Sequence, residues 1–303
     1  MRKILFDSDT ASDDTLALLL AIRKFEVLGV TIVAGNVGFE NQVRNALFTL
    51  EYFGYDAPVF LGPRRPIMGI WKTVEEVHGA NGLGGWNFPE PSKSPDSEFA
   101  ADALLRISKA YSGELEILAV SPLTNIALAY LKDPAVVRRV KKLWVMGGAF
   151  YRGNTTQIAE FNFWVDPEAA RIVLNAGFDV TIVPWETAEQ SACISKADWE
   201  DIARRKTKAS EFFVRSNAAL LNYSLRSGAE GSVHPDSLTA AIAFDQSIVT
   251  EAKTLAVDVE TCAGGRGAML LDSYGLTGKQ PNASVVYRAD SSKFRELVLS
   301  QLS

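Results

Sequence analysis

The sequence predicts an α/β protein with an open, mostly parallel (mixed) sheet and helices on both faces. Short runs rich in β-branched residues alternate with longer amphipathic segments, the pattern of βαβ units. The strand candidates are apolar almost throughout, as expected when both faces of a sheet are buried. No Pro/Ser-rich linker and no internal repeat divides the 303 residues, so we expect a single Rossmann-like domain over residues 1–303.

Strands and helices are predicted to alternate up to about residue 183. The predicted strands are Lys3–Phe6, Val27–Val33, Val59–Leu61, Leu115–Val120, Leu143–Met146 and Val180–Val183. The predicted helices, with apolar residues at helical spacing, are Asp14–Lys24, Glu40–Phe53, Glu98–Tyr111, Thr124–Leu131 and Pro167–Ala176. In sheets of this kind the chemistry takes place at the carboxyl ends of the strands, where loops lead into helices.

After about Ser195 the pattern becomes helical, and it returns to strands before a last helix. The later helices are predicted at Lys196–Arg205, Ser210–Ser224, Ser237–Phe244 and Ser292–Gln301, and the later strands at Leu255–Val259, Ala268–Leu271 and Ser284–Tyr287. Residues 62–97 hold five of the twelve prolines, together with Trp71 and Trp86. Since such a long loop in a compact domain is usually functional, we expect an active-site loop there; the alternative is a plain surface loop.

Charge and composition indicate which classes of partner to expect. The net charge is −5 and no basic face is visible, so we expect no nucleic-acid partner. No stretch reaches about 18 apolar residues and no secretory signal is visible, so we expect no membrane span. The two cysteines, Cys193 and Cys262, are too few for a disulfide framework or a zinc site. We therefore expect a cytoplasmic protein.

The most informative segment is ILFDSDTASDD, which places Asp7, Asp9, Asp13 and Asp14 directly after a buried strand. A helix N-terminus favours one or two carboxylates there. It does not account for four, because like charges at close range repel strongly in a partly buried site. Either several are protonated or a cation holds them together, and we favour the cation. Carboxylate oxygens select Ca²⁺ or Mg²⁺, and the loop lacks the glycine and glutamate of an EF-hand.

One alternative is a Mg²⁺-dependent phosphatase of the haloacid dehalogenase type. The stretch from Asp7 to Ala11 partly resembles that family's DxDxT motif, in which the first aspartate is the nucleophile. However, Ala11 stands where the motif has threonine, and the pair Asp13–Asp14 is foreign to it. No convincing late acidic pair follows a strand at the expected spacing.

A series of motifs resembles the inosine–uridine-preferring nucleoside hydrolase family from residue 3 to the C-terminus. The segment Asp7–Asp14 looks like its DxDxxxDD signature, with Thr-Ala in place of the usual Pro-Gly. The other similar segments are Val33–Val37 (VAGNV), Arg44–Leu47, His78–Gly84 (HGANGLG), Leu123–Asn125, Met146–Ala149 (MGGA), Glu160–Asn162, Val165–Ala170, Arg266–Gly267 and Pro281–Asn282. Any one of these motifs is weak, but together, in order and properly spaced, they are strong.

The resemblance implies Ca²⁺-dependent hydrolysis of the N-glycosidic bond of ribonucleosides, releasing free base and ribose. The implied calcium ligands are Asp9, Asp14, the backbone carbonyl of Thr124, and Asp236 from the helical segment 196–244. By the same resemblance, the ion would hold a water, Asp9 would take its proton as general base, and the transition state would resemble an oxocarbenium ion. Taken alone, Asp236 could also be a helix N-cap.

The resemblance also implies the substrate contacts. Asp13, Asn36 and Asn162 would bind ribose hydroxyls, Asn154 and Glu160 would hold the 5′-hydroxyl, and Met146 would pack nearby. Asn154 in a Gly-Asn turn and Asn162 as a loop cap are the structural alternatives. His78 would shape its loop or touch the base edge, and Trp71, Trp86 or Trp185 could stack on the base. The family further implies a homodimer or homotetramer.

Two positions depart from the family pattern. The family often has a histidine directly before the late aspartate, proposed to protonate the leaving base, whereas here Pro235 stands there and His234 lies one place earlier. His234 is therefore a candidate acid whose direction the proline can change. Trp185 and Glu186 stand where the family commonly has an aliphatic residue and aspartate. The altered histidine also keeps open a nucleoside- or ribose-binding protein without turnover.

Overall fold

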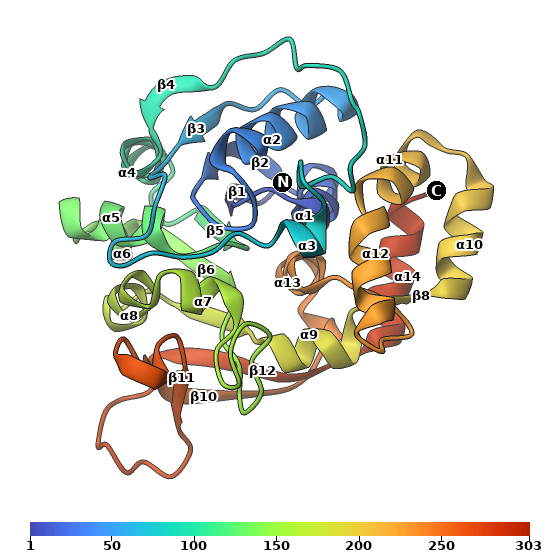
Figure 1. Ribbon diagram of the computed structural model, residues 1–303. Coiled ribbons are helices and arrows are strands. Elements are labelled where there is room, and N and C mark those ends of the chain that lie inside the picture. The colour runs from blue at the N-terminus through green and yellow to red at the C-terminus, as the bar shows by residue number, and fades with distance from the viewer.

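Ten strands form the main sheet of the computed structural model, which describes residues 1–303 (Figure 1). Their order across the sheet is β11-β10-β12-β7-β6-β5-β1-β2-β3-β4. The strands are β1 Lys3–Ser8, β2 Glu26–Ile32, β3 Val59–Leu61, β4 Asp96–Phe99, β5 Leu115–Ala119, β6 Val140–Met146, β7 Val180–Val183, β10 Val249–Val259, β11 Met269–Asp272 and β12 Ala283–Ala289. Strand β10 runs antiparallel to both neighbours, and the other pairs are parallel, so the predicted mixed α/β sheet is confirmed.

The helices cover both faces of this sheet (Figure 1). They are α1 Ser12–Lys24, α2 Phe39–Phe53, α3 Glu75–His78, α4 Ala100–Ala110, α5 Thr124–Lys132, α6 Val136–Arg139, α7 Phe161–Val165, α8 Pro167–Asn175, α9 Trp185–Ser191, α10 Lys196–Arg205, α11 Lys208–Ser216, α12 Ala218–Arg226, α13 Pro235–Phe244 and α14 Ser291–Gln301. A small antiparallel pair, β8 Cys193–Ser195 and β9 Gly231–Val233, lies outside the main sheet.

Alternate side chains of β1 enter two separate cores, which explains its nearly continuous apolar sequence. Ile4 and Phe6 belong to the core under α1, α2, α13 and α14, whereas Leu5 belongs to the core under α4, α5 and α8. Because both faces are covered, no polar face is left on the strand. The first polar side chains of β1 therefore appear only at its carboxyl end.

Two sequence predictions are corrected by the structure. The helix predicted over Ser210–Ser224 is two helices, α11 and α12, which meet at Asn217. The side chains of Ser216 and Asn217 donate to the carbonyls of Phe212 and Phe213, and such local bonds compete with the continuing helix. The helix predicted from Glu98 begins at Ala100, because the preceding residues pair as the edge strand β4.

The loop 62–97 carries the short helix α3 and is anchored by an aromatic cluster. This cluster consists of Phe48, Tyr52, Trp86, Phe88 and Phe212. Phe48 and Phe88 stack with their ring centroids 4.2 Å apart, and Trp86 meets Phe48 edge-on at 5.2 Å. Trp86 is thus a packing residue that fixes the loop to α2 and α11, rather than a platform for a base.

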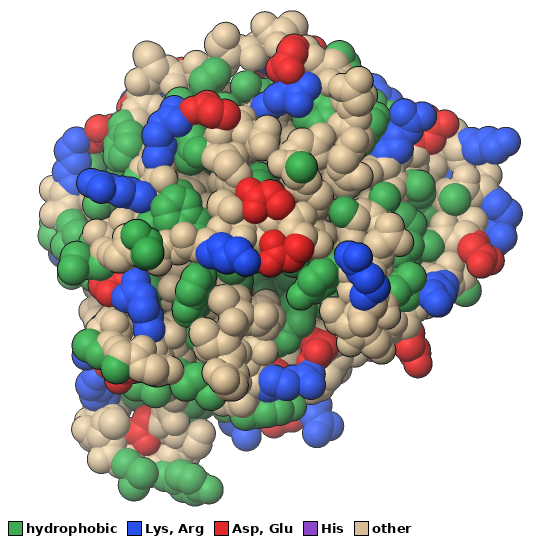
Figure 2. Space-filling model, in the orientation of Figure 1, with side chains coloured by type: hydrophobic (Ala, Val, Ile, Leu, Met, Phe, Trp, Pro, Cys, Tyr) green, Lys and Arg blue, Asp and Glu red, His purple; other side chains and the backbone are tan.

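The surface shows no concentration of one kind of charge on the face seen in Figure 2, where Lys and Arg side chains are interspersed with Asp and Glu. No histidine is visible on this face, in keeping with the burial of both histidines. Among the helices, none has the length and apolar character needed to cross a membrane.

We expect Phe212→Ala to lower the free energy of unfolding by about 3–5 kcal/mol, because it removes a fully buried ring and leaves a cavity. Urea unfolding measures this change, and limited proteolysis should then cut within residues 62–97. Tyr274→Ala is the control, since Tyr274 is 88% exposed. Equal stability of the two variants would show that the aromatic cluster does not hold the loop.

Candidate active site

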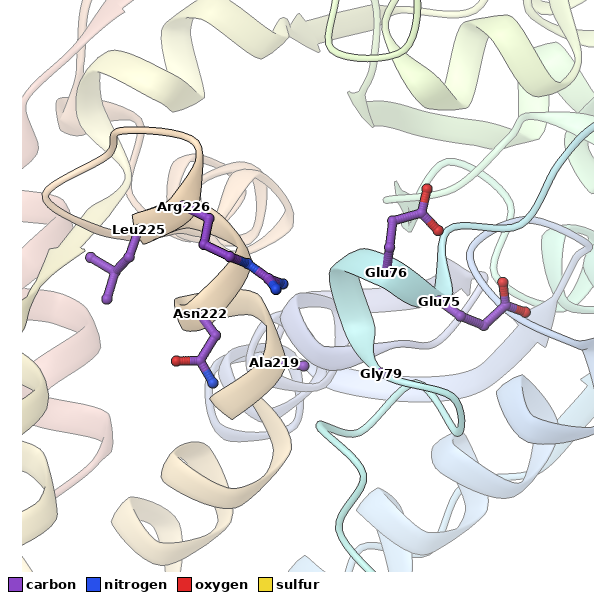
Figure 3. Close-up of a pocket in the computed structure, with 7 residues that line it drawn as sticks. All are labelled: Glu75, Glu76, Gly79, Ala219, Asn222, Leu225 and Arg226. Carbon is purple, nitrogen blue, oxygen red and sulfur yellow. The ribbon is translucent and has the colours of Figure 1, made fainter.

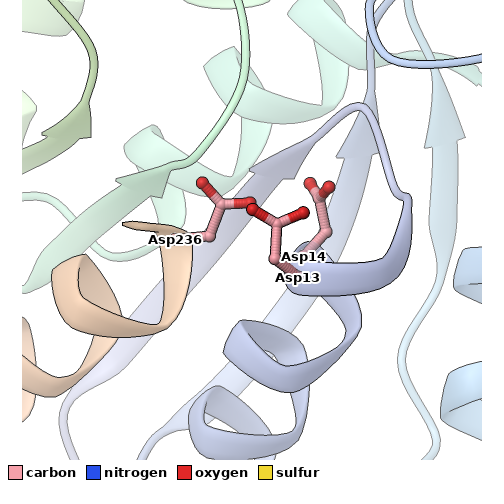
Figure 4. A group of neighbouring side chains, drawn as sticks. All are labelled: Asp13, Asp14 and Asp236. Atoms are coloured by element: carbon pink, nitrogen blue, oxygen red, sulfur yellow. The ribbon is translucent and has the colours of Figure 1, made fainter. Parts of the chain in front are cut away.

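Four aspartates converge at the carboxyl end of β1, in the middle of the sheet. Asp9 directly follows the strand, Asp13 and Asp14 lie in the first turn of α1, and Asp236 lies in the first turn of α13. Figure 4 shows the side chains of Asp13, Asp14 and Asp236 turned toward one another from these two helices. One carboxylate oxygen from each of these three residues lies within 4.8 Å of the other two. We call Asp9, Asp13, Asp14 and Asp236 the aspartate cluster. The group formed by Asp13, Asp14 and Asp236 could bind a metal ion.

Asp9 and Asp14 are fixed by neighbouring polar groups. The backbone N–H of Asn36 donates to Asp9 Oδ2 at 2.8 Å, and the Asn36 side chain donates to Asp14 Oδ2 at 3.1 Å. Asp14 also accepts from Ser8 Oγ at 2.7 Å. By contrast, Asp9 Oδ1 and Asp13 Oδ1 are buried and have no hydrogen-bond partner. Buried unpaired oxygens are costly and need an explanation, and a bound cation would supply one.

Burial, and then the charges of neighbouring carboxylates, raise the pKa of Asp9, Asp14 and Asp236. Burial, followed by the charges of Asp13 and Asp14, raises the pKa of Asp236 well above its usual range. The pKa of Asp9 is raised for the same reasons, and the pKa of Asp14 is raised to about 8. An opposite charge reverses this effect, since it favours the ionised carboxylate. The all-oxygen donor set fits a hard divalent cation.

Asp7 is not available for chemistry. Its carboxylate is fully buried and accepts hydrogen bonds from Thr31 Oγ1 at 2.5 Å, Asn125 Nδ2 at 2.8 Å and Ser121 Oγ at 3.0 Å. It therefore ties β1 to β2 and to the segment after β5. The first aspartate of a haloacid dehalogenase must attack a phosphate, and this one is enclosed, so the phosphatase alternative is not favoured.

His78 brings the loop 62–97 to the aspartate cluster. It ends α3, its Nδ1 lies 2.6 Å from Ser12 Oγ, and the same atom is 3.7 Å from Asp13 Oδ1. Burial lowers the pKa of His78, which favours the neutral form of the ring. Trp71 of the same loop donates from Nε1 to the carbonyl of Gly35 at 3.0 Å, which holds the loop over the segment after β2.

A second set of interacting side chains lies at the end of β6. Asn162 donates from Nδ2 to the carbonyl of Met146 at 3.2 Å and lies 3.3 Å from its sulfur. Glu160 is buried and accepts from the backbone N–H groups of Gly148 and Asn162. Burial raises the pKa of Glu160 to about 7. Asn154 is exposed, and its Oδ1 accepts from Phe161 N at 2.9 Å, so its side chain braces the loop between β6 and α7.

Thr124 begins α5, and its hydroxyl donates to Asp166 Oδ2 at 2.6 Å. Asp166 also accepts from the backbone N–H of Ile67 at 2.9 Å and caps α8 through Ala169. This buried aspartate therefore joins α5 to the start of the loop 62–97. In the sequence, Asp166 is recognisable only as part of a motif, because an Asp-Pro pair before a helix is also typical of an ordinary N-cap.

His234 directly precedes α13 and stands two positions before Asp236. The ring is fully buried, its Nε2 lies 2.7 Å from Ser232 Oγ, and it packs against Phe213. Burial lowers the pKa of His234 to about 3. A neutral imidazole bonded to Ser232 is a poor proton donor at neutral pH, so this geometry argues against the acid role suggested by the sequence. Pro235 begins α13 directly after it.

An open cavity of about 460 Å³ lies between α3 and α12. Figure 3 shows its walls, with the carboxylates of Glu75 and Glu76 on one side and the side chains of Asn222 and Arg226 on the other. Gly79, which follows His78, also lines it. The cavity thus adjoins the loop that reaches the aspartate cluster.

Comparison with known proteins places this geometry in a family. The model of the inosine-uridine preferring nucleoside hydrolase family matches residues 4–296. The chain belongs to this family. A relative from Escherichia coli O157:H7 described as the pyrimidine-specific ribonucleoside hydrolase RihB is 30% identical over 305 residues, covering 98% of this chain and 96% of that protein. Uridine nucleosidase 1 of Arabidopsis thaliana is 42% identical over 186 residues, so the match spans 55% of that protein.

Solved structures of nucleoside hydrolases have the same fold. The plant nucleoside hydrolase PpNRh1 superposes with a TM-score of 0.94 at 29% identity, covering 99% of this chain and 98% of that chain. A purine-preferring ribonucleoside hydrolase from Gardnerella vaginalis gives a TM-score of 0.93 at 27% identity, covering 99% and 98%. This nucleoside hydrolase is therefore an enzyme, and the resemblance read from its motifs is confirmed.

Trp185 lies at the start of α9 in this nucleoside hydrolase. It is partly buried against the core under α1 and α13, and its backbone N–H donates to the carbonyl of Gly148. The following residue, Glu186, is 1% exposed and accepts three backbone N–H groups of the loop after β6. Sequence reasoning noted Glu186 only as a departure from the family pattern.

A substitution at Gly35 tests whether activity depends on the position of the Asp9 carboxylate, because an added side chain there would contact it. A Cβ at Gly35 would lie 1.9 Å from Asp9 Oδ2, so Gly35→Ala must displace the Asp9 carboxylate. We expect at least about a 100-fold loss of hydrolase activity, because small displacements of reacting groups are costly.

The matched control is Gly38→Ala, three residues further on, where the nearest atom to the added Cβ is 4.0 Å away. It should keep both activity and stability. Equal activity of the two variants in a reducing-sugar assay would show that the position of Asp9 is unimportant.

Proposed function

We propose that this chain hydrolyses the N-glycosidic bond of ribonucleosides in a Ca²⁺-dependent reaction that releases free base and ribose. The observation that carries the proposal is the pair of buried, unpartnered oxygens, Asp9 Oδ1 and Asp13 Oδ1, within four converging aspartates. A divalent ion and a sugar diol together would satisfy such oxygens. The family and its nucleoside-hydrolysing members support the substrate class.

The ion would be held by Asp9, Asp14, Asp236 and the backbone carbonyl of Thr124. These oxygen donors fit Ca²⁺, which takes six to eight oxygen ligands. When bound, Ca²⁺ would offset the charge of the cluster and make a nearby water a better nucleophile. Asp166 supports this arrangement because it holds the hydroxyl of Thr124 at the start of α5.

Asp9 is the proposed general base. Its Oδ2 is fixed by the backbone N–H of Asn36, whereas its Oδ1 has no partner and can receive a proton. The water oxygen bonds to the anomeric carbon while Asp9 takes one of its protons, and the bond to the base breaks with its electron pair going to the base nitrogen. That nitrogen takes a proton from solvent, and Asp9 then releases its proton to solvent, so that free base and ribose are the products. The carboxylates of the cluster stabilise the positive charge that develops on the ribosyl ring.

The sugar would be oriented by the polar groups at the ends of β1, β2 and β6. Asp13, Asn36 and Asn162 would bind the ring hydroxyls, Asn154 and Glu160 the 5′-hydroxyl, and Met146 would pack against the sugar. A site built to pair hydroxyls rejects sugars that lack them, because its buried polar groups are then unmatched. Deoxyribonucleosides should therefore be poor substrates.

The base would lie toward α3 and α12, where the open cavity adjoins His78. Relatives point to both classes of base, since one is described as pyrimidine-specific and another as purine-preferring. His78 would touch the base edge, and Trp185 would stack from the start of α9. His234 is left out of this proposal. A homodimer or homotetramer and a cytoplasmic location stay predictions.

Activity should depend on the ion. We expect a panel of purine and pyrimidine ribonucleosides to yield reducing sugar with Ca²⁺ and none after chelation. At about 100 times its dissociation constant, Ca²⁺ should add about 2.7 kcal/mol to the free energy of unfolding. Calorimetric binding of a nucleoside without sugar release would identify a binding protein instead.

Asp9→Asn should lower kcat by about 10³-fold while the fold stays intact, because it removes the proton acceptor. The control is Asp56→Asn, since Asp56 is exposed and pairs only with Lys93. Circular dichroism checks the fold of both variants. Hydrolysis of inosine and uridine by Asp9→Asn at the parent rate would show that the mechanism is wrong.

A further inference from the structure

Glu186 is a buried acid with no basic partner. Its side chain lies in the first turn of α9 and is 1% exposed, and no Lys, Arg or His lies within ion-pair distance. Instead, Oε1 accepts from the backbone N–H groups of Phe150 at 2.9 Å, Tyr151 at 2.8 Å and Arg152 at 2.8 Å, and Oε2 accepts from Phe150 at 2.8 Å. Three successive amides form a concave anion site, and a carboxylate of the same chain fills it.

These amides begin the loop 147–160, which has no helix or strand of its own. Tyr151 is 69% exposed and Ile158 is 42% exposed, so hydrophobic burial does little to define the path of this loop. At its far end, Glu160 accepts from Gly148 N, Asn162 N and Phe163 N. Two buried carboxylates thus hold the loop at both ends, and Phe150 stacks on Tyr287 with centroids 4.5 Å apart.

The two carboxylates also interact electrostatically. The charge of Glu186 contributes to the raised pKa of Glu160, although burial is the larger cause. Without the amides, Glu186 on α9 and Glu160 at the end of the loop would repel each other. The amides of residues 150–152 therefore let Glu186 stay buried near Glu160.

The loop carries Asn154 and Glu160, the proposed contacts of the 5′-hydroxyl. Asn154 follows the amides of residues 150–152 by two positions, and Glu160 is tied to the start of the same loop through the N–H of Gly148. We infer that Glu186 is a positioning residue for the 5′-hydroxyl subsite: by holding the amides of residues 150–152, it sets where Asn154 and Glu160 meet the 5′ end of the ribose. This inference rests on the proposed function.

The test variant is Glu186→Gln, which keeps the size of the side chain but replaces one acceptor oxygen with an N–H donor that faces the same amides. The matched control is Glu189→Gln on the same helix, where the side chain is 35% exposed and pairs with the Arg152 guanidinium. Each variant is assayed with a ribonucleoside and with the corresponding 5′-deoxyribonucleoside, which lacks only the hydroxyl in question.

In the parent, the ribonucleoside should have the higher kcat/KM. In Glu186→Gln, this preference should fall by about 10-fold, because the lost subsite matters only to the substrate that has the hydroxyl. Glu189→Gln should keep the parent's preference. An equal loss of kcat/KM for both substrates would show a merely structural role for Glu186, and parental kcat/KM for both substrates would show no role, so either result overturns the inference.

Two further measurements keep the test decisive. If Glu186→Gln does not fold, Glu186→Asp retains the charge with a shorter reach and should still lower the preference for the 5′-hydroxyl. If the parent releases no sugar from any ribonucleoside, the proposed function has failed. In that case, calorimetry measures the affinities of ribose and 5-deoxyribose for the parent and for Glu186→Gln. The variant should lose the difference in affinity between the two sugars. An unaltered difference overturns the inference.

Discussion

The buried carboxylates at the end of β1 repel one another, and the arrangement of the site around them has to offset this repulsion. Two unit charges 4 Å apart repel by about 4 kcal/mol even at an effective dielectric constant of about 20. Four aspartates meet here because Asp9 follows β1, α1 contributes Asp13 and Asp14 from its first turn, and α13 contributes Asp236 from its first turn. Helix N-termini favour negative charge, which offsets part of the repulsion. The remainder is the physical reason to expect a cation.

The structure assigns different roles to acids that are adjacent in sequence. Asp7 is enclosed by three side-chain donors and joins strands, whereas Asp9, two residues later, keeps an unpaired oxygen at the site. Side chains along a strand alternate between its two faces, so residues two apart point to the same face while the strand continues. Because β1 ends at Ser8, Asp7 lies within the strand and Asp9 lies beyond it, and the two acids have different surroundings. The fold thus uses one carboxylate as a structural hub and leaves the next, also buried, with an oxygen that has no hydrogen-bond partner.

The two loops beside the site are held by different means. Aromatic packing around Phe48 fixes the loop 62–97, and its reach to the aspartate cluster comes through His78. The loop 147–160 is fixed mainly by backbone amides bound to Glu160 and Glu186. Aromatic packing tolerates changes of side chain that conserve volume, whereas amide–carboxylate bonding depends on charge and exact reach. Substitutions in the second loop should therefore affect substrate orientation more directly.

The sequence by itself determined the α/β class, most element positions and the family, because apolar periodicity and ordered motifs are local properties of the chain. It also located the acids of Asp7–Asp14, since four carboxylates after a buried strand are visible without coordinates. The family resemblance implied Asp236 as a partner of Asp9 and Asp14, and the fold brings its carboxylate to Asp13 and Asp14. The bond between His234 and Ser232, and the hold of Glu186 on the loop after β6, came from the tertiary structure alone. These facts depend on which distant segments meet and where each side chain points, and neither is encoded in residue spacing.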